Sequence, residues 1–587
     1  MLSFSVYDII RTSEKSRISP EETFLDILTQ YALTASRYII VLLSLAIIVR
    51  FIRSMLSGAY EDEYWGYITF GKEDIPILHW ENILGSSHTS DIYLDARNLS
   101  RTHAALVRNG KGEWRIFDIF SRGGVWVNND QVRSKGLPVR DGDVLNLGGN
   151  PMVFNAVSDE ERAEFSEGRT SAGKTVLPSV TLFELTVLQL FMLMQLAVSD
   201  DEHILMITEG FLLIIAVEWI CFFLMKAMHR NGFEVETLAF YLTSFGLAVV
   251  CISEPSDLYK QMILIAVSVV LFILLGLWLR NIRRVSHAVR YIVAFLALAL
   301  LGVNVAAGTV YNGAANWLTI SGYSFQPSEL VKVAYVFCGA ATLENLYHRR
   351  NLILFIGFSA VCVGALAVIG DFGTALIFFI CFLIISFMRS GSIATVFLAV
   401  GGAVMAVFMV LMVRPYVADR FSAWGHVWED VYDKGYQQTR AMSAAASGGL
   451  FGNMPGNGWL HRIFAADTDM VFALVCENYG LIAALCCITA ILTLAFFAIR
   501  SARRGRSTYY SIAACASVSI MMVQLALNVF GSVDLLPFTG VTFPFVSKGG
   551  TSLISCWMLM AFLKSADTRK EGSFAVIPEF KKAKEGS

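Results

Sequence analysis

Two carboxylates in the carboxyl-terminal half of the chain are spaced in a way that suits acid–base chemistry. Asp469 lies where a long polar loop runs into an apolar segment, and Glu477 follows eight residues later. If this segment begins a membrane-spanning helix, Asp469 lies in its first turn at the water boundary, and Glu477 lies about 12 Å deeper. A carboxylate at membrane depth is costly unless it is paired or lines a wet cavity. The pattern predicts a reaction pocket with Asp469 at its rim, and the alternative is that Asp469 only starts a helix.

The loop before Asp469 carries side chains that suit an anionic, sugar-bearing substrate. It spans 414–468 and contains cations, aromatic residues and amides, among them Arg414, Arg420, Trp424, Trp428, Gln437 and Arg440. Guanidinium groups match diphosphates, and aromatic rings pack on sugars. The alternative is an interfacial belt of the kind that flanks membrane spans. Because long loops without obvious structure are often functional, we expect this loop to contact substrate.

Further polar clusters fall at the ends of other apolar segments. Glu329 and Lys332 are three residues apart, so they share one helical face and can neutralise each other. Asp371 lies at a turn between two apolar segments, and Ser547 with Lys548 lies at another. For each cluster alone, capping or helix packing explains the residues without any catalytic role.

The elements that must position these groups are predicted to be membrane helices. The chain has 587 residues, of which 55% are hydrophobic and 16% charged, and its mean hydropathy is +0.57. This composition excludes an ordinary soluble protein, and the net charge of -2 argues against a nucleic-acid partner. About thirteen spans are expected: one over 36–56, two additional ones over 178–230 and about ten over 235–566.

Basic residues between the apolar segments predict the orientation of the chain. Arg50 and Arg53 follow the first predicted span. Basic residues recur at 280–284, 348–350 and 500–504 and in the tail 567–587. Cytoplasmic loops are enriched in Lys and Arg, so these segments are expected inside. Residues 1–35 and the loop 414–468 are then expected outside.

The polar segment 64–157 is predicted to be a small cytoplasmic β-sandwich, because short alternating strands are separated by Gly, Asn and Asp. Its motifs resemble those of a forkhead-associated (FHA) domain at 83–87, 91–94, 99–104, 118–124 and 141–143. The resemblance implies binding of a phosphothreonine protein through Ser100 and Arg101, with Arg122 and Asn128 as further candidates. His103 is interpreted as a packed framework residue.

Two departures from the FHA pattern keep an alternative open. Gly85-Ser86 stands where the family usually has Gly-Arg, and Gly123-Gly124-Val125 stands where it usually has Asn-Gly-Thr. The first departure removes a phosphate-binding arginine, for which Arg101 or Arg122 would have to compensate. A docking module that does not need phosphate is the alternative.

The linker 158–177 contains a sequence that matches the P-loop pattern letter for letter, at 168–175. A P-loop requires a preceding strand and a following helix. No apolar strand precedes this segment, and Pro178 interrupts the helix that should follow. We interpret the linker as a flexible tether, with Thr170 or Thr175 open to phosphorylation.

Taken together, the motifs from about 235 to 564 resemble the SEDS family (shape, elongation, division and sporulation), the FtsW and RodA type of peptidoglycan polymerase. They are Trp317 with 326–329 and Lys332; 371–375; Tyr436-Gln437 with 447–449; Thr468-Asp469 with Glu477 and Gly480; Gln524 with Asn528; and 544–552. The resemblance implies a polytopic α-helical membrane protein with a core of about ten helices. About three extra amino-terminal spans and an all-β FHA sandwich are attached to it.

The resemblance also implies a peptidoglycan glycosyltransferase that polymerises lipid II on the outer face of the bacterial cytoplasmic membrane, in division, elongation or sporulation. Asp469 matches the family's essential carboxylate and would take a proton from the acceptor sugar, which contributes on the order of 10²–10⁴ in rate. Cations for the leaving diphosphate would come from Arg414, Arg420, Arg440, Lys332 and Lys548. Glu329, Lys332 and Glu477 are expected to shape the cavity.

The resemblance further implies a class B penicillin-binding protein as partner. No cofactor is identified; a divalent cation would assist the leaving diphosphate, although no ligand cluster identifies one. Two other classes of function remain as alternatives. One is a lipid II flippase that uses the same acidic cavity without making bonds, and the other is an FHA-bearing membrane scaffold of the division machinery.

Overall fold

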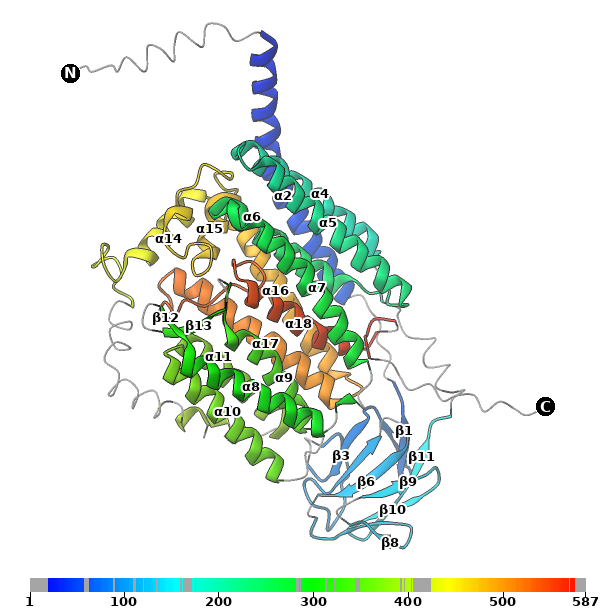
Figure 1. The fold of residues 1–587 in the computed structure, drawn as a ribbon. Coiled ribbons are helices and arrows are strands. Elements are labelled where there is room, and N and C mark those ends of the chain that lie inside the picture. Colours follow the sequence, from blue (N-terminus) through cyan, green and yellow to red (C-terminus); the bar gives the residue numbers. More distant parts are fainter. Residues whose placement is uncertain are drawn as a thin grey trace.

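The computed structural model describes residues 20–56, 63–158, 161, 172–174, 176–343, 349–404, 424–569 and 571–575. Short gaps fall inside these ranges at 88–89, 109–111, 120, 134–135, 281–283, 286, 312–313 and 321–322, and several residues between 391 and 403 are also outside the description. A helical bundle makes up most of the described chain, and a β-sandwich lies at one end of it (Figure 1).

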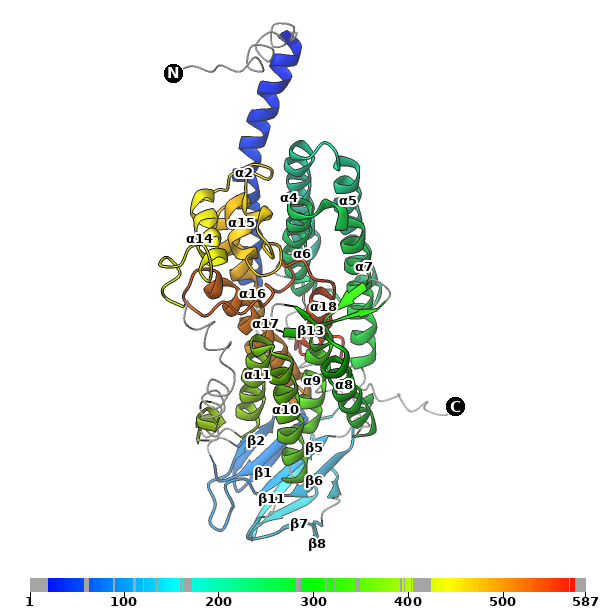
Figure 2. The ribbon, with the colours of Figure 1, turned by 60° about the vertical axis from the view of Figure 1, so that its left-hand side comes forward.

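The first helix is longer than predicted. α2 (Pro20–Leu56) begins well before residue 36, where the predicted span starts, so part of the segment 1–35 is helical. Pro20 followed by Glu21 and Glu22 suits a helix start, because proline fits the first turn and acidic residues oppose the helix dipole. The part of α2 from Leu28 to Met55 is apolar enough to span a membrane, and its amino-terminal end projects beyond the bundle (Figure 2).

The predicted β-sandwich is confirmed and consists of two sheets. The six-stranded sheet has the order β2-β1-β11-β10-β7-β8 and the five-stranded sheet β4-β3-β5-β6-β9. Their strands are β1 (Gly66–Phe70), β2 (Glu73–Ile77), β3 (Glu81–Gly85), β4 (Ile92–Tyr93), β5 (Ala104–Arg108), β6 (Trp114–Asp118), β7 (Val125–Val127), β8 (Asp130–Gln131), β9 (Leu137–Val139), β10 (Val144–Leu147) and β11 (Asn150–Ala156). Apolar side chains such as Leu106, Ile116 and Phe154 are fully buried between the sheets.

Helices are found over most of the ranges 178–230 and 235–566, where the membrane spans are predicted. They are α4 (Pro178–Ser199), α5 (Ile204–Ala227), α6 (Glu234–Ser253), α7 (Leu258–Leu279), α8 (His287–Ala307), α9 (Pro327–Leu343), α10 (Arg349–Ile369), α11 (Phe372–Ser390), α16 (Leu481–Arg503), α17 (Thr508–Ser532) and α18 (Gly550–Ser565). Within the range 235–566, where about ten spans are predicted, only scattered residues are described from 393 to 404. In the described chain, eight helices are long and apolar enough to cross a membrane, so the multi-pass prediction is confirmed.

Burial separates central helices from peripheral ones. In its most apolar stretch, α6 is 94% buried and α17 is 78% buried, whereas α8 is only 22% buried. A helix that is apolar all round and buried belongs to the core of a bundle, and an exposed apolar helix in such a protein faces lipid. α17 is therefore a central helix of the bundle, and its two ends contact both domains of the protein.

The FHA-bearing end of the bundle is fixed to the start of α17. The Trp80 amide donates to the Arg506 carbonyl oxygen at 2.7 Å, just before the helix begins. The buried Glu81 carboxylate accepts the Ser507 hydroxyl at 3.0 Å and the Thr508 amide at 2.5 Å. Burial raises the pKa of Glu81, against the opposing effect of these hydrogen bonds. The sandwich is thus joined to the bundle by buried polar contacts.

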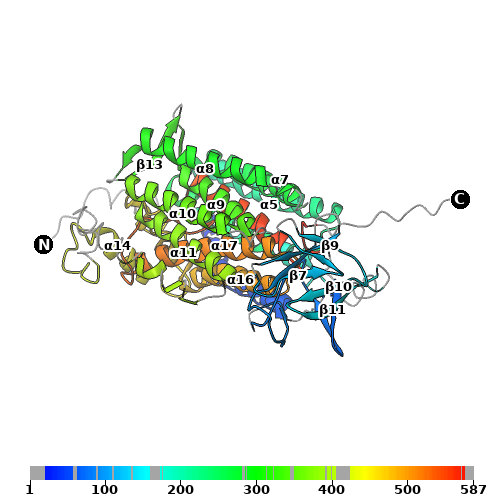
Figure 3. The same ribbon diagram turned by 90° about the horizontal axis from the view of Figure 1, so that it is seen from below.

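The opposite end of the bundle carries elements that the sequence reading did not include (Figure 3). A small sheet follows α8, with strands β12 (Thr309–Tyr311), β13 (Ala314–Ile320) and β14 (Tyr323–Phe325). The signal was present, because Asn-Gly and Ser-Gly pairs between alternating residues are typical of hairpin turns. The same end holds α14 (Tyr436–Gly448), the short helix η4 (Leu460–Arg462) and α15 (Val471–Tyr479).

The predicted continuous helix through Asp469 and Glu477 is wrong. Asp469 precedes α15, which has only nine residues and ends at Tyr479. Gly480 follows with φ +90°, and a Cβ atom there would lie 2.3 Å from the Leu450 carbonyl oxygen. This close approach requires glycine and breaks the helix, so that the spanning helix α16 starts afresh at Leu481.

Candidate functional site

The backbone of Asp469 is held in place from two directions. Its amide donates to the Ala465 carbonyl oxygen at 2.9 Å, closing a turn in which Ala465 has φ +60°. Its carbonyl oxygen accepts the Asn528 side-chain amide at 3.0 Å, and the same amide donates to the Val541 carbonyl oxygen at 2.9 Å. Asn528, from the end of α17 away from the FHA domain, therefore joins the segment before α15 to the loop before α18.

Space beside the Asp469 carboxylate is kept open by a glycine. Gly540 has φ +66°, and a Cβ atom at this position would lie 3.2 Å from Asp469 Oδ2. The Asp469 side chain is half-buried, and α15, which follows it, lies at the end of the bundle away from the FHA domain (Figure 2). A carboxylate with a fixed backbone and an accessible side chain can act on a bound molecule, in contrast to one that only caps a helix.

Ser547 and Lys548 hold the loop before α18 against the Asp469 turn. The Ser547 hydroxyl donates to the Thr468 carbonyl oxygen at 2.6 Å, and the Lys548 amide donates to the Asp467 carbonyl oxygen at 2.8 Å. The Lys548 ammonium lies 2.9 Å from the Asp257 carboxylate and 3.3 Å from the Asp467 carboxylate. Although partial burial lowers the pKa of Lys548, these two carboxylates raise it above its usual value overall. Its charge is therefore already balanced within the protein.

The sequence predicts that Glu477 lies beneath Asp469 in an open pocket, but the structure shows otherwise. Its side chain is fully buried near the end of α15. Its carboxylate accepts the Trp459 amide at 2.9 Å and the Leu460 amide at 3.2 Å, at the start of η4. Glu477 thus fixes the loop that leads to Asp469, and it does so with a charge that backbone N–H groups satisfy.

The predicted pairing of Glu329 with Lys332 is confirmed. The two side chains are buried and lie 2.7 Å apart on α9, and the Ser555 hydroxyl donates to the other Glu329 oxygen at 2.7 Å. Asp371 accepts the Thr374 amide at 2.9 Å at the start of α11 and the Gln326 side-chain amide at 3.3 Å. These buried contacts tie α9, α11 and α18 together.

Hydrogen bonds connect this buried cluster to the loop beside Asp469. The backbone amide of Gln326 donates to the Thr551 hydroxyl at 3.3 Å, at the start of α18. One residue further, the Ser552 hydroxyl lies 2.9 Å from the Thr542 hydroxyl, which also accepts from Gln524 of α17 at 3.4 Å. The SEDS-like motifs of α9, α17 and α18 therefore meet within a single polar network.

The remaining predicted residues of this end are placed as follows. The Gln437 amide donates to the Phe464 carbonyl oxygen at 3.0 Å, which holds α14 next to the Asp469 turn. Arg440, half-buried on α14, lies over the Tyr436 ring at 5.2 Å. Trp317 is half-buried on β13. Arg414 and Arg420 lie outside the described residues.

The FHA residues separate into two groups. The Ser100 hydroxyl accepts the Arg122 amide at 3.2 Å, so Ser100, Arg101 and Arg122 gather on one exposed edge of the sandwich. Asn128, just after β7, instead donates to the Asp143 carboxylate and accepts the Val144 amide at the start of β10. His103 is buried and bonds to the Ser100 amide and the Gly124 carbonyl oxygen, which confirms its framework role.

Gly540 and Asp257 were not among the predicted residues of the site, and Asn528 was predicted as part of a motif but not as a backbone anchor. Asn528 carries a recognisable signal, because it is a polar residue within the apolar stretch of α17. No local pattern relates Asp257 to Lys548, which lies far away in sequence. In the part of the chain that the structure describes, no group of three His, Cys, Asp or Glu residues has the geometry of a metal site.

Comparison with known proteins gives two family matches. Residues 238–572 match the FtsW/RodA/SpoVE family, described as cell cycle proteins, and residues 82–148 match the FHA domain family. Both resemblances drawn from the sequence motifs are thereby confirmed. The first match covers more than half of the chain, including Asp469 and every SEDS-like motif.

Individual relatives agree with the family matches. The peptidoglycan glycosyltransferase RodA of Mycobacterium tuberculosis is 28% identical over 327 residues, which cover 52% of this chain and 69% of the relative. The probable peptidoglycan glycosyltransferase FtsW of Tolumonas auensis is 30% identical over 282 residues, covering 46% and 73%. The crystal structure of RodA from Thermus thermophilus aligns with 56% of this chain and 94% of that chain, at 21% identity and a TM-score of 0.43.

Proposed function

Because the chain belongs to the FtsW/RodA/SpoVE family of cell cycle proteins, we propose that it is a peptidoglycan glycosyltransferase that polymerises lipid II. The observation that carries this proposal is the placement of Asp469. Its backbone is anchored by Asn528, its side chain is half-exposed, and Gly540 leaves room beside the carboxylate. Membership of the family together with this geometry favours an enzyme over an inert scaffold.

The proposed reaction is a sugar transfer with Asp469 as general base. The carboxylate accepts the proton of the acceptor hydroxyl while that oxygen forms a bond to the anomeric carbon of the donor. The bond from this carbon to the diphosphate breaks, and the lipid diphosphate leaves with the electron pair. A base positioned in this way contributes on the order of 10²–10⁴ in rate.

The leaving diphosphate requires positive charge that is free to turn towards it. Lys332 is paired with Glu329, and Lys548 is paired with Asp257 and Asp467. Three of the five predicted cations lie in the described part of the chain, and of these Arg440 forms no ion pair with a carboxylate. Its helix, α14, is held next to the Asp469 turn. We assign the diphosphate contact to Arg440, with Arg414 and Arg420 as further candidates from the same loop.

The protein is a multi-pass protein of the bacterial cytoplasmic membrane, and we propose that its FHA domain faces the cytoplasm. The basic segments at the ends of α7, α16 and α18 lie on the FHA-bearing side of the bundle, as the enrichment of cytoplasmic loops in Lys and Arg requires. Asp469 then faces outside, where peptidoglycan is assembled. The same orientation gives the site access to lipid II in the outer leaflet.

We further propose that a class B penicillin-binding protein is the partner on the outer side, and that the FHA domain binds a phosphothreonine protein inside. Ser100, Arg101 and Arg122 gather on one edge and offer a hydroxyl and two guanidinium groups to a phosphate. Fluorescence anisotropy with phosphorylated and unphosphorylated peptides tests the second proposal. Equal binding of both peptide forms would make the domain a phosphate-independent docking module.

Purified full-length protein with labelled lipid II tests the catalytic proposal. Wild-type protein, supplied with a transpeptidase partner where needed, is expected to form glycan chains, and Asp469→Ala is expected to form none. Asp433→Asn, an exposed acidic position of the same outer loop, is the matched control and should polymerise normally. Undiminished polymerisation by Asp469→Ala would remove the catalytic assignment. Transbilayer movement of lipid II without polymer would indicate a flippase.

A further inference from the structure

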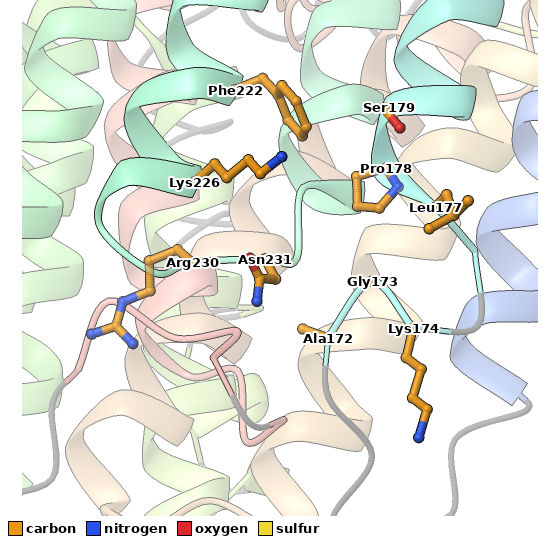
Figure 4. A pocket seen from close by; sticks show the side chains of 10 residues that line it. All are labelled: Ala172, Gly173, Lys174, Leu177, Pro178, Ser179, Phe222, Lys226, Arg230 and Asn231. Carbon is orange, nitrogen blue, oxygen red and sulfur yellow. The ribbon is translucent and has the colours of Figure 1, made fainter.

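A cavity lies at the FHA-bearing end of the bundle, away from the proposed catalytic site. It has a volume of about 320 Å³ and lies between the carboxyl end of α5, the start of α4 and the last part of the FHA linker. Its lining includes the three cations Lys174, Lys226 and Arg230 and the apolar residues Leu177 and Phe222 (Figure 4). No acidic residue is among the described residues that line it.

The three cations surround the cavity from different elements. Lys226 extends from α5 towards the start of α4, whereas Arg230, from the turn after α5, and Lys174, from the linker, lie on opposite sides of the view (Figure 4). Within the described chain, none of these three side chains forms an ion pair with a carboxylate. Burial lowers the pKa of Arg230, and the charges of Arg280 and Arg506 lower it further, while Glu571 raises it. The cavity is therefore positively charged without full compensation.

The linker segment that supplies Lys174 packs against the turn between α5 and α6. Gly173 has φ +79°, and a Cβ atom there would lie 2.7 Å from the Asn231 carbonyl oxygen. Ala172 is buried and packs against Gly232. A Cβ atom added at Gly232 would lie 2.9 Å from the Ala172 Cβ. Tight packing on the turn between α5 and α6 thus fixes the position of Lys174.

The start of α4 adds to the attraction for an anion. Leu177 precedes the helix without a side-chain cap, and Pro178 occupies its first turn. The amino end of a helix carries a partial positive charge, here directed at a cavity already lined by cations. Lys174 is also the lysine of the P-loop-like sequence, but the described residues of that segment form no strand, as a nucleotide-binding P-loop would require.

The surroundings of the cavity distinguish a lipid from a soluble anion. α4 and α5 are both apolar enough to span the membrane and are only partly buried. Leu177, which lines the cavity, is 61% exposed, and large apolar side chains of both helices are also exposed, with Phe183 of α4 at 61% and Phe223 of α5 at 58%. Such side chains face acyl chains in a bilayer, whereas the cations lie at the level of phosphates.

We propose that this cavity binds the phosphate of an acidic phospholipid from the leaflet on the FHA-bearing side. Lys226 and Arg230 contact the phosphate, Lys174 closes over it from the linker, and the acyl chains follow the exposed surfaces of α4 and α5. The bound lipid would fasten the FHA linker to the membrane surface. This inference concerns a second site and does not depend on the proposed polymerase activity.

The test uses full-length protein in nanodiscs that contain both phosphatidylglycerol and phosphatidylcholine. Native mass spectrometry after extraction measures which lipid is retained. Wild-type protein is expected to retain phosphatidylglycerol preferentially, and Lys226→Ala and Lys174→Ala are each expected to reduce the preference about fivefold. Arg503→Ala, an exposed basic position on the same side that does not line the cavity, should leave it unchanged.

Three results would overturn the proposal. The first is an equal retention of both lipids by wild-type protein, and the second is an unchanged preference in both lysine variants. The third is displacement of phosphatidylglycerol by inorganic phosphate or ATP at concentrations that leave the lysine variants unaffected, which would make the cavity a site for soluble anions. Because Lys174 and Lys226 are exposed, their variants are expected to fold.

Discussion

Carboxylates at the two ends of the bundle differ in how deeply they are buried. At the FHA-bearing end, Arg569 lies 2.8 Å from both Glu234 and Asp567, and Lys564 lies 3.0 Å from Glu236, with all five side chains buried. At the opposite end, Asp469 is half-buried, and the protein holds its backbone while leaving space at its side chain. The difference separates carboxylates that fasten helices from one that can meet a substrate.

The same contrast exists within the outer half of the bundle. Glu329 and Glu477 belong to the same set of family motifs as Asp469, yet both are buried. The Glu329 carboxylate is paired with Lys332 and accepts the Ser555 hydroxyl. The Glu477 carboxylate accepts two backbone amides. A buried charge with a full set of partners costs much free energy if a partner is removed. Such residues support the site, whereas half-buried Asp469 is the carboxylate that we propose for the chemistry.

The largest effect is expected on removing one partner of the buried cluster. Arg569→Ala leaves Glu234 and Asp567 without their shared cation, which should destabilise the protein by about 3–5 kcal/mol. Thermal unfolding in detergent measures the change, with Arg503→Ala as an exposed control. An Arg569→Ala protein as stable as wild type would show that the cluster does not hold the helices, and the comparison would fail.

A smaller effect is expected from loosening the anchor of Asp469. Asn528→Ala removes the amide that donates to the Asp469 and Val541 carbonyl oxygens. Because a misplacement of about 1 Å can cost on the order of 10² in rate, polymerisation should fall by up to that factor. Lipid II turnover per folded molecule is the measurement, and Asn457→Ala in the exposed outer loop is the control. Normal turnover by Asn528→Ala would remove its positioning role.

The smallest effect concerns the FHA attachment at the other end of α17. Because the pKa of Glu81 is raised in the folded protein, the contact is strongest at low pH and weakens as the pH rises through the raised value. Glu81→Gln keeps an acceptor for Ser507 and Thr508 and should abolish this dependence. Hydrogen exchange of the first α17 amides, followed against pH, measures it. Faster exchange in the glutamine variant at every pH would contradict the assignment.

The sequence predicts the helices and strands well because their patterns are local. Apolar runs place the spans, and alternating residues place the strands of the sandwich. The site motifs are also visible, since Asp469, Glu329 and Lys332 are polar residues in apolar surroundings. The pairing of Glu329 with Lys332 follows from helical spacing alone, and the structure confirms it.

What the sequence does not predict depends on contacts between distant segments. The helix break at Gly480 follows from the approach of the Leu450 backbone, and the neutralisation of Lys548 follows from Asp257 on another part of the bundle. Glu477 looks like a second pocket acid until the loop at Trp459 is seen to cover it. Such features need the packed structure, because no local pattern encodes the partner.

The most direct test of the account compares Asp469→Asn with Glu329→Gln in one set of preparations. Both lipid II polymerisation per folded molecule and thermal stability are measured for each variant. The account predicts that Asp469→Asn loses at least about 10² in rate with unchanged stability, whereas Glu329→Gln loses stability. Substantial polymerisation by Asp469→Asn with wild-type stability would contradict the claim that this carboxylate performs the chemistry.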